Sequence, residues 1–316
     1  MRVLFFADGE WGAKTLAKVY KSGYEIAGVV VRYKSRDGLV EDWTKNNNLP
    51  LFKFKKINSE EAYTKLKALS PDVIVSIAYD QILKRRLLDL AKTIAFNVHA
   101  GDLPKYRGNN PINWAIINGE EKIGITAHVM SEEIDLGPII EKIYVPVTLE
   151  DNYATVLKKV VASIPDLVLD VLSQIRNKTI KLRHINREEG FYMPRRGEKD
   201  EIIKWFDTSK NIYNLIRAIT RPAPGAYTYL GKQKLRVWSA KLIESPKFIA
   251  NPGQVMEVLK EGVIVKTGDT QILLNEVQFE GESNSFIPHF PVGTRLGLPY
   301  SDLEDYWPFL SSNKPE

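Results

Sequence analysis

Cysteine is absent from this chain of 316 residues. Its absence excludes disulfides, thiolate metal sites and mechanisms that use a cysteine nucleophile. Histidine is scarce, with four residues in all. We find no spacing of histidine and acidic residues that is typical of a metal site, so no metal is expected.

Long apolar runs are absent as well. No run approaches the roughly 20 residues that are needed to cross a bilayer. The apolar start, residues 1–7, is too short for a signal peptide and leads directly into a strand-like pattern. We therefore expect no membrane span and a cytoplasmic location.

A strong charge of one sign is also missing, since the net charge is only +5. Mild basic clusters occur at residues 53–56, 84–86 and 195–196. They are typical of solvated surface, or they attract an anionic substrate. No basic stripe with interleaved aromatic residues is present, so we expect no nucleic-acid partner.

The first hundred residues alternate between apolar runs and amphipathic segments. We predict strands over 3–7, 26–31, 71–77 and 93–98, and helices over 13–20, 39–47, 59–69 and 81–90. This alternation is typical of an α/β fold with a mostly parallel, Rossmann-like sheet, in which ligands bind at the carboxyl ends of strands. No Gly-x-Gly-x-x-Gly follows the first strand, which argues against NAD.

The texture of the sequence changes after residue 187. Before it we predict a helix over 110–118, strands over 123–130 and 139–147, and a helix over 151–177. After it we predict a helix over 209–220, and then short strands at 226–230, 234–242, 253–259, 262–266 and 272–279 that suggest a small OB-like β-barrel. The expected domains are 1–190 (catalytic), 191–206 (linker) and 207–316 (small β domain).

Polar residues end the fourth of the predicted strands. Asn97 and His99 are two residues apart, so in a strand they point to the same side. A later carboxylate, Asp135, could pair with the imidazole, as bases are oriented in many acyl-transfer sites. The pattern indicates polar chemistry without a protein nucleophile.

The same segment resembles the formyltransferases that use 10-formyltetrahydrofolate. The resemblance rests on Asn97-Val98-His99, on Leu103-Pro104-Lys105-Tyr106-Arg107-Gly108, on Gly124-Ile125-Thr126-Ala127-His128 and on Asp135-Leu136-Gly137. Gly101-Asp102 stands where the family usually has Ser-Leu, and the sequence leaves open what this change does. The order of catalytic domain, linker and small barrel is similar to that family too.

The resemblance implies roles for three catalytic residues. Asn97 would donate a hydrogen bond to the tetrahedral oxyanion. His99 would take the proton of the attacking amine, and Asp135 would orient His99 and stabilise its cationic form. The acceptor amine is then the nucleophile. His128 is expected to brace the site.

The resemblance also implies two sets of binding residues. The residues expected at the 10-formyltetrahydrofolate co-substrate are Tyr79, Gln81, Ile82, Leu103, Pro104 and Gly137. The residues expected at the second substrate are Asp8, Glu10, Lys105, Tyr106, Arg107, Arg195 and Arg196. The arginine pair would hold a pyrophosphate, or it is plain linker surface.

The second substrate implied by the resemblance is a nucleotide-linked amino sugar. The segment from Trp205 to Trp238 looks like that of UDP-4-amino-4-deoxy-L-arabinose formyltransferases and dTDP-amino-sugar N-formyltransferases. Such enzymes supply surface polysaccharide such as lipopolysaccharide O-antigen, and a homodimer is usual. The resemblance favours a dTDP-4-amino-4,6-dideoxyhexose or UDP-4-amino-4-deoxy-L-arabinose, and the choice between UDP and dTDP, the sugar, and the carbon that bears the amine stay open.

Two alternatives remain at this stage. One is methionyl-tRNA formyltransferase, which carries a basic insertion after the second strand. Here residues 31–38 lead at once into the next helix, which favours a small substrate. The other, of a different class, is a non-catalytic folate-binding protein, against which the complete set of Asn97, His99 and Asp135 argues.

Overall fold

The computed structural model describes residues 1–35 and 37–297 of the chain, and it contains two compact units. The first unit consists of Met1–Ile112, Glu121–Val147 and Val156–Arg195. The second consists of Asn113–Glu120, Thr148–Thr155 and the chain from Arg196 onward. Two short segments from the first half of the chain therefore belong to the second unit, which no composition change in the sequence indicates.

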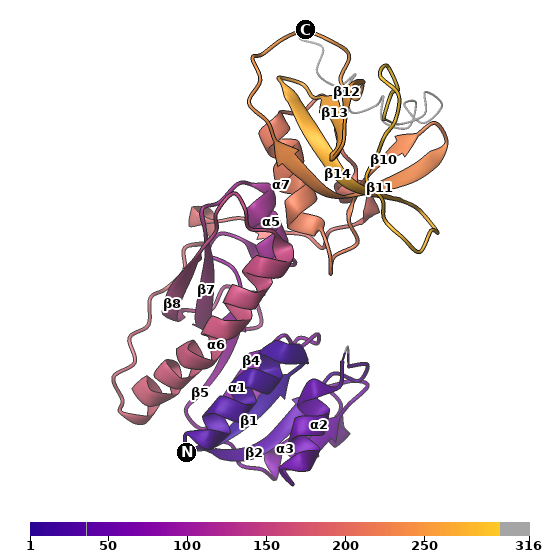
Figure 1. Cartoon of the computed structure of the whole chain (residues 1–316). Coiled ribbons are helices and arrows are strands. Elements are labelled where there is room, and N and C mark those ends of the chain that lie inside the picture. Colours follow the sequence, from indigo (N-terminus) through magenta and orange to yellow (C-terminus); the bar gives the residue numbers. More distant parts are fainter. Residues whose placement is uncertain (36, 298–316) are drawn as a thin grey trace, which may run out of the picture. The chain divides into compact units, whose positions relative to one another are not determined.

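A seven-stranded sheet forms the centre of the first unit (Figure 1), in the order β3-β2-β1-β4-β5-β7-β8. The strands from β3 to β5 are parallel, whereas β7 and β8 are antiparallel to their neighbours. This confirms the predicted mixed α/β fold with a parallel Rossmann-like sheet. The strands are β1 (Arg2–Ala7), β2 (Glu25–Val31), β3 (Leu51–Lys53), β4 (Val73–Ile77), β5 (Ile94–His99), β7 (Lys122–Val129) and β8 (Ile139–Pro146).

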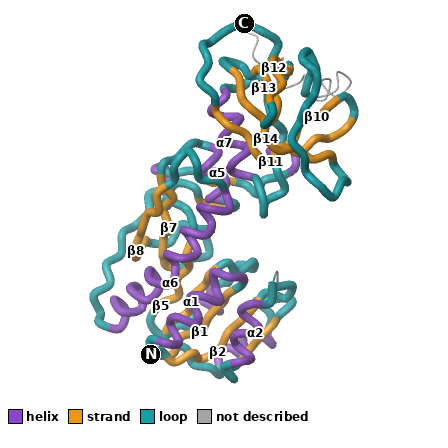
Figure 2. The backbone as a smooth tube through the Cα atoms, in the orientation of Figure 1, coloured by secondary structure: helices purple, strands orange, loops and turns teal. Residues whose placement is uncertain are grey.

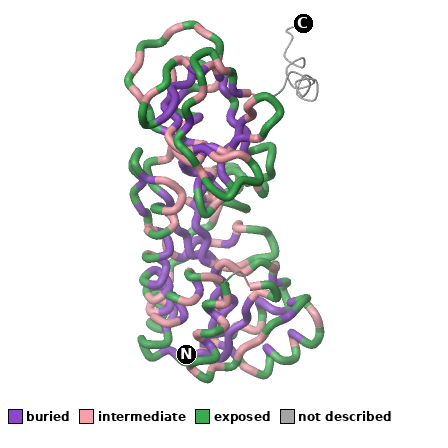
Figure 3. Tube along the Cα trace, turned by 45° about the vertical axis from the view of Figure 1, so that its right-hand side comes forward, coloured by how far each residue is buried: buried purple, intermediate pink, exposed green. Residues whose placement is uncertain are grey.

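Both faces of the sheet are buried, and the burial follows from the sequence of β1. Its residues from Val3 to Ala7 are all apolar and fully buried, as expected for a strand covered on both sides. Leu4 and Phe6 pack with α3 (Glu60–Lys67) and the segment after β4. The buried strands are visible in Figure 3.

Several helices of the chain have amphipathic sequences. Helix α1 (Gly9–Lys21) lies against β1 and against α2 (Leu39–Asn46). The two helices approach closely at Gly12: a Cβ added there would lie 3.0 Å from Val40 Cγ2. The long α6 (Tyr153–Arg176) buries an apolar stripe that includes Val160, Ile164 and Val168. Among the described residues, no helix combines the length and apolarity needed to cross a membrane.

The predicted helix over 81–90 is wrong: only Arg85–Leu88 form a helix, α4. The preceding backbone binds to a side chain instead of forming helical hydrogen bonds. Asn58 Oδ1 accepts from the backbone N–H of Lys84 at 2.9 Å, and Asn58 Nδ2 donates to the carbonyl of Ile82 at 2.8 Å. A polar side chain from another part of the chain thus competes with the local helical preference.

The second unit contains a five-stranded antiparallel sheet, in the order β10-β11-β14-β13-β12. Helix α7 (Ser209–Ile219) packs on it (Figure 2), and Thr208 caps this helix by accepting from Asn211 N–H at 3.2 Å. The strands are β10 (Ala226–Leu230), β11 (Gln233–Leu242), β12 (Val255–Leu259), β13 (Gly262–Lys266) and β14 (Gln271–Phe279).

The barrel prediction is not confirmed. In the described residues the sheet is open, and isolated bridges involve its two edge regions: Ile202 with Tyr227, Leu230 with Leu296, and Gln254 with Arg295. The remaining short elements are α5 (Pro111–Ile117), β6 (Arg107–Gly108), β9 (Tyr192–Met193) and the 3₁₀ turns η1 (Arg187–Glu189) and η2 (Glu198–Glu201).

Candidate active site

Two neighbouring strands place three polar side chains on one face of the first unit's sheet. Asn97 and His99 lie two residues apart near the end of β5. His128 on β7 is directly opposite Asn97 in the antiparallel register. Asn97 Nδ2 is 3.3 Å from His128 Nε2. The spacing along β5 places Asn97 and His99 on one face, and the pairing of β5 with β7 adds His128 to the cluster.

Asp135, in the turn after β7, joins the two imidazoles. Its Oδ2 lies 3.5 Å from His99 Nδ1 and its Oδ1 lies 3.4 Å from His128 Nε2. Gly108 N–H donates to Oδ2 at 2.8 Å. Asp135 has φ +55°, in the left-handed region, a conformation that costs about 1–3 kcal/mol and that occurs preferentially at functional sites.

The second nitrogen of each imidazole also faces an oxygen. His99 Nε2 is 2.7 Å from the Tyr106 carbonyl, and His128 Nδ1 is 3.0 Å from the Val129 carbonyl. Carbonyls accept only, so both nitrogens act as donors there. Both rings are buried, with 7% of His99 and 3% of His128 exposed. One carboxylate is thus shared by two buried imidazoles, an arrangement suited to holding and moving a proton.

The carboxyl of Asp135 is strongly biased toward its charged form. Burial alone would raise its pKa, but His99, His128 and the Gly108 N–H together hold the pKa of Asp135 well below its usual range. The group is therefore an anion near neutral pH.

This bias predicts an acid-sensitive contribution to stability. Because the folded-state pKa of Asp135 is depressed, its contribution is fully present above the unfolded value of about 3.9 and is lost as the pH falls below it. We expect the difference in free energy of unfolding between the wild type and Asp135→Asn to shrink between pH 7 and pH ~3 in urea titrations. A difference that stays constant over this range would contradict the assignment.

Known proteins match this chain over almost its whole length. A family profile described as formyl transferase matches residues 1–172, and one described as formyl transferase, C-terminal domain, matches residues 197–290. The chain is 34% identical to a methionyl-tRNA formyltransferase of Bacillus subtilis, with 94% of this chain and 98% of that relative covered.

The chain belongs to the formyl transferase family. It is an enzyme that transfers formyl groups, and the family uses 10-formyltetrahydrofolate as the formyl donor. The alternative of a non-catalytic folate-binding protein is therefore set aside.

Solved structures of formyl transferases share the fold. An N-formyltransferase of Helicobacter canadensis, in complex with folinic acid and dTDP-3-aminofucose, superposes with a TM-score of 0.65 at 22% identity, with 86% of this chain and 98% of that chain covered. HypX of Aquifex aeolicus, in complex with tetrahydrofolic acid, gives a TM-score of 0.63 at 18% identity. This comparison covers 92% of this chain but only 49% of HypX, so this chain spans about half the length of that protein.

The relatives correct the predicted substrate. Further relatives at 28% to 33% identity are also described as methionyl-tRNA formyltransferases. The prediction of a nucleotide-linked amino sugar, with an O-antigen pathway and no nucleic-acid partner, is therefore wrong. It rested on the resemblance of residues 205–238 to sugar formyltransferases and on the short connection between β2 and α2, whose described part is indeed short. The missing insertion is one element that could dock tRNA, and its absence says nothing about the rest of the surface.

The residues expected at folate in this formyl transferase lie in two places. After β4, Tyr79 is partly buried, packs edge-on against Phe6 at 5.3 Å, and burial raises the pKa of its hydroxyl. The Gln81 amide is occupied by the chain itself, since its Oε1 accepts from Ile57 N–H at 2.9 Å. Ile82 is exposed. Of these three, Ile82 offers the most exposed side chain, and the Tyr79 hydroxyl has a weak contact with Gln81 Nε2 at 3.5 Å.

The other three expected folate residues are packed inside the first unit. Leu103 is fully buried. A Cβ on Gly190 would lie 2.0 Å from the Pro104 carbonyl oxygen, and one on Gly137 would lie 1.8 Å from the Val129 carbonyl oxygen. The need for glycine at position 137 thus has a packing explanation that requires no ligand.

Two of the expected substrate residues lie near the start of α1. Asp8 is almost fully buried, accepts from Ser35 Oγ at 2.8 Å, and its Oδ2 is 3.4 Å from Arg32 Nε. Glu10 pairs with Lys14 at 2.7 Å on the surface. Asp8 is therefore occupied by internal partners, and Glu10 is part of an ordinary exposed helix pair.

The loop after β5 carries the next three expected substrate residues. Lys105 is exposed, whereas Tyr106 is buried, has φ +54° and packs edge-on against Phe191 at 4.8 Å. Arg107 lies in β6, which pairs with β9. Only 5% of Arg107 is exposed, and its Nε has no hydrogen-bond partner among the described residues. An unsatisfied buried donor next to Gly108 marks a position that can bind an anion or a carbonyl of a substrate.

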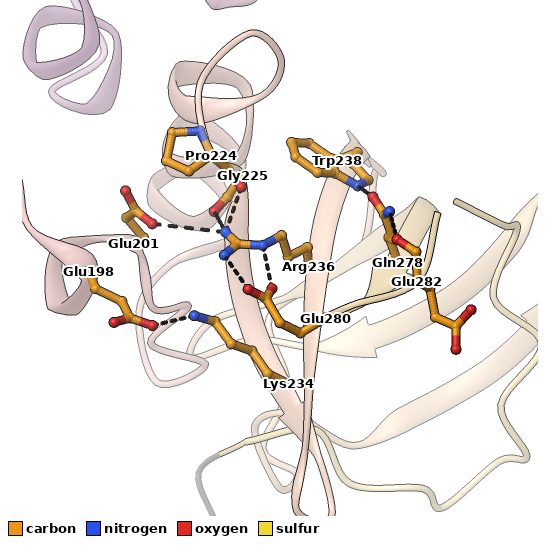
Figure 4. A network of polar contacts seen from close by, with 10 residues as sticks. All are labelled: Glu198, Glu201, Pro224, Gly225, Lys234, Arg236, Trp238, Gln278, Glu280 and Glu282. Atoms are coloured by element: carbon orange, nitrogen blue, oxygen red, sulfur yellow. Dashed lines mark hydrogen bonds and ion pairs between the residues drawn. The ribbon is translucent and has the colours of Figure 1, made fainter. Parts of the chain in front are cut away.

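Arg195 and Arg196, the last two residues expected at the second substrate, lie in different units. Arg195 is exposed at the end of the first unit, whereas Arg196 belongs to the second, where its Nε is 3.5 Å from Glu201 Oε1. Glu201 also faces Arg236, 4.0 Å away, in a network that continues to Glu280 (Figure 4). The pyrophosphate role expected for the pair is set aside together with the sugar substrate.

Two features of the site escaped the sequence analysis. His128 was expected only to brace the site, yet it contacts both Asn97 and Asp135; its place opposite Asn97 depends on strand register. The partner of Asp102 was not foreseen at all: Lys142, at 2.5 Å. In the described residues no group of three or more potential metal ligands is found.

Proposed function

We propose that this formyl transferase moves the formyl group of 10-formyltetrahydrofolate onto the α-amine of methionine esterified to tRNA. The observation that carries this proposal is the match to methionyl-tRNA formyltransferases over 94% of this chain and 98% of the Bacillus subtilis relative. Both the sheet unit and the C-terminal segment take part in the match. The predicted cytoplasmic location stays a prediction, and it suits a substrate of translation.

The donor set of the site fits a formyl group under attack. When the amine adds to the formyl carbon, the carbonyl oxygen gains negative charge and needs donors that are already in place. Asn97 Nδ2 can supply one, because its present partner, His128 Nε2, is at the long distance of 3.3 Å. We assign Asn97 to this role, as predicted from the sequence.

The proton of the attacking amine needs an acceptor as the C–N bond to the formyl group forms. We assign its transfer to His99 together with Asp135. Their distance of 3.5 Å is longer than a hydrogen bond, and such catalytic contacts often tighten only when substrate binds. A protonated His128 can donate from Nε2 to the other oxygen of the same carboxylate, 3.4 Å away, when His99 exchanges its proton. When the bond between the formyl carbon and the folate nitrogen breaks, that nitrogen takes up a proton and leaves as the N–H of tetrahydrofolate.

A direct assay tests the proposal. The enzyme is incubated with 10-formyltetrahydrofolate and methionyl-tRNA, the ester is cleaved, and the released amino acid is analysed by mass spectrometry. We expect formylmethionine, formed in proportion to the tetrahydrofolate released. Uncharged tRNA serves as the control, since it lacks the amine. Release of tetrahydrofolate without formylmethionine would contradict the proposed acceptor.

A further inference from the structure

We propose that Lys142 and Asp102 are positioning residues for His99. They anchor the start of the loop from Gly101 to Gly108, and the later part of this loop presents the Tyr106 carbonyl to the imidazole. Neither residue touches the reacting atoms. The acceptor used in one assay below rests on the proposed function, but the positioning claim does not.

The anchor is a compact set of polar contacts between the loop and β8. Lys142 Nζ donates to Asp102 Oδ1 and to the Leu103 carbonyl, each at 2.5 Å. Tyr144 OH donates to the same Asp102 oxygen at 3.1 Å. Only 12% of the Lys142 side chain is exposed. An ion pair that is partly withdrawn from water and also binds a backbone carbonyl fixes its loop more firmly than an exposed pair does.

Strand β7 also holds the start of the loop. A Cβ on Gly124 would lie 2.7 Å from Asp102 Cα, so only glycine lets the loop backbone come this close. Thr126 Oγ1 donates to the Gly101 carbonyl at 2.7 Å. In the β7–β8 register, Gly124 is opposite Tyr144 and Thr126 is opposite Lys142. The same two cross-strand pairs thus hold both the backbone and the carboxylate.

The far part of the loop binds the catalytic cluster. The Tyr106 carbonyl, three residues after Leu103, is 2.7 Å from His99 Nε2, and Gly108 N–H donates to Asp135 at 2.8 Å. Tyr106 has φ +54°, a strained conformation that must be held by its surroundings. The start of the loop is also packed tightly against the imidazole: a Cβ added to Gly101 would lie 2.5 Å from His99 Nε2. A displacement of residues 101–103 would therefore change the position of the His99 imidazole.

This assignment gives a meaning to the departure from the family pattern. A leucine at position 102, as the family usually has, could neither accept from Tyr144 nor pair with Lys142. In this chain an ion pair holds the loop at this position. A purely electrostatic surface role would leave the geometry of His99 unchanged, and this difference can be measured.

The test compares four variants by spectroscopy and by kinetics. Lys142→Met removes both hydrogen bonds that Lys142 donates, Lys142→Arg restores the charge and the donors, and Asp102→Asn removes the charge while Lys142 can still bind Leu103. Lys65→Met is the matched control, because it removes an exposed lysine that pairs with Glu61 at 2.7 Å in the same unit. Each variant is prepared with isotope-labelled histidine, and the imidazole N–H signal of His99 is assigned by its absence in His99→Gln.

In the wild type we expect a His99 Nε2–H signal that is protected from solvent exchange. In Lys142→Met and Asp102→Asn we expect this protection to be lost and turnover to fall by about tenfold or more, since small misplacements of catalytic groups have large effects. Lys142→Arg and Lys65→Met are expected to retain both. Protection and turnover that are unchanged in Lys142→Met, or in Asp102→Asn if Lys142→Met does not fold, would overturn the proposal.

The two proposals fail in different ways. If the wild type does not formylate methionyl-tRNA, the proposed acceptor is wrong, yet the exchange comparison between wild type and variants still decides whether Lys142 and Asp102 position His99. If the wild type is active and the His99 signal is the same in all variants, only the positioning claim falls.

Discussion

The His99→Gln variant is expected to lose formyl transfer to methionyl-tRNA by a factor of about 10²–10⁴, the usual contribution of a general acid–base group. The side chain is buried against Asp135 and the Tyr106 carbonyl, and glutamine can hydrogen bond to either but cannot exchange a proton near neutral pH. The measurement is single-turnover formylation, which isolates the chemical step from product release.

Two controls make this result specific. His184 is exposed, so His184→Gln should retain normal turnover. Folate affinity, measured by calorimetry, should change less than about threefold in His99→Gln, because a group that acts only in the transition state contributes little to ground-state binding. Substantial turnover in a folded His99→Gln enzyme would remove His99 from the proton-transfer role.

The Asn97→Ala variant is expected to lose about 10²–10³ in turnover, which corresponds to the loss of one oxyanion donor. The amide has a single weak contact in the site, to His128 Nε2 at 3.3 Å, so its removal leaves the buried imidazole with its bond to Val129. The variant is compared with wild type in single-turnover assays and in urea unfolding.

The pattern of the two measurements separates catalysis from structure. Loss of turnover with an unfolding free energy within about 1 kcal/mol of wild type supports the donor role. Asn97→Asp is the matched variant, since it has nearly the same shape but no N–H donors and adds a charge near Asp135. Normal turnover in Asn97→Asp would exclude Asn97 as the oxyanion donor.

Local sequence patterns predicted four of the five parallel strands and missed the short β3. Strand β1 is apolar and buried on both faces from Val3 to Ala7, and its neighbours carry the same signal, so the Rossmann-like sheet could be predicted. The helix over 81–90 could not be excluded, because the competing hydrogen bonds come from Asn58, more than twenty residues earlier. The closure of a small barrel depends on pairing between its edge strands, and the spacing of strands along the sequence does not predict that pairing.

The candidate site shows the same division. Asn97 and His99 were visible from their spacing on one strand, and Asp135 from its motif. The position of His128 required the register between β5 and β7, and the Asp102–Lys142 pair required the register between β7 and β8. The substrate was mispredicted because the absence of one insertion was given more weight than the similarity of the whole chain.

The most direct test of the account is a competition in one reaction. The enzyme and limiting 10-formyltetrahydrofolate are mixed with equal concentrations of methionyl-tRNA and of UDP- and dTDP-linked amino sugars, and mass spectrometry measures which amine gains the formyl group. The account predicts formyl on methionyl-tRNA, with an apparent KM that rises steeply with salt because phosphate contacts release counterions. Formyl found only on the nucleotide sugars would contradict it.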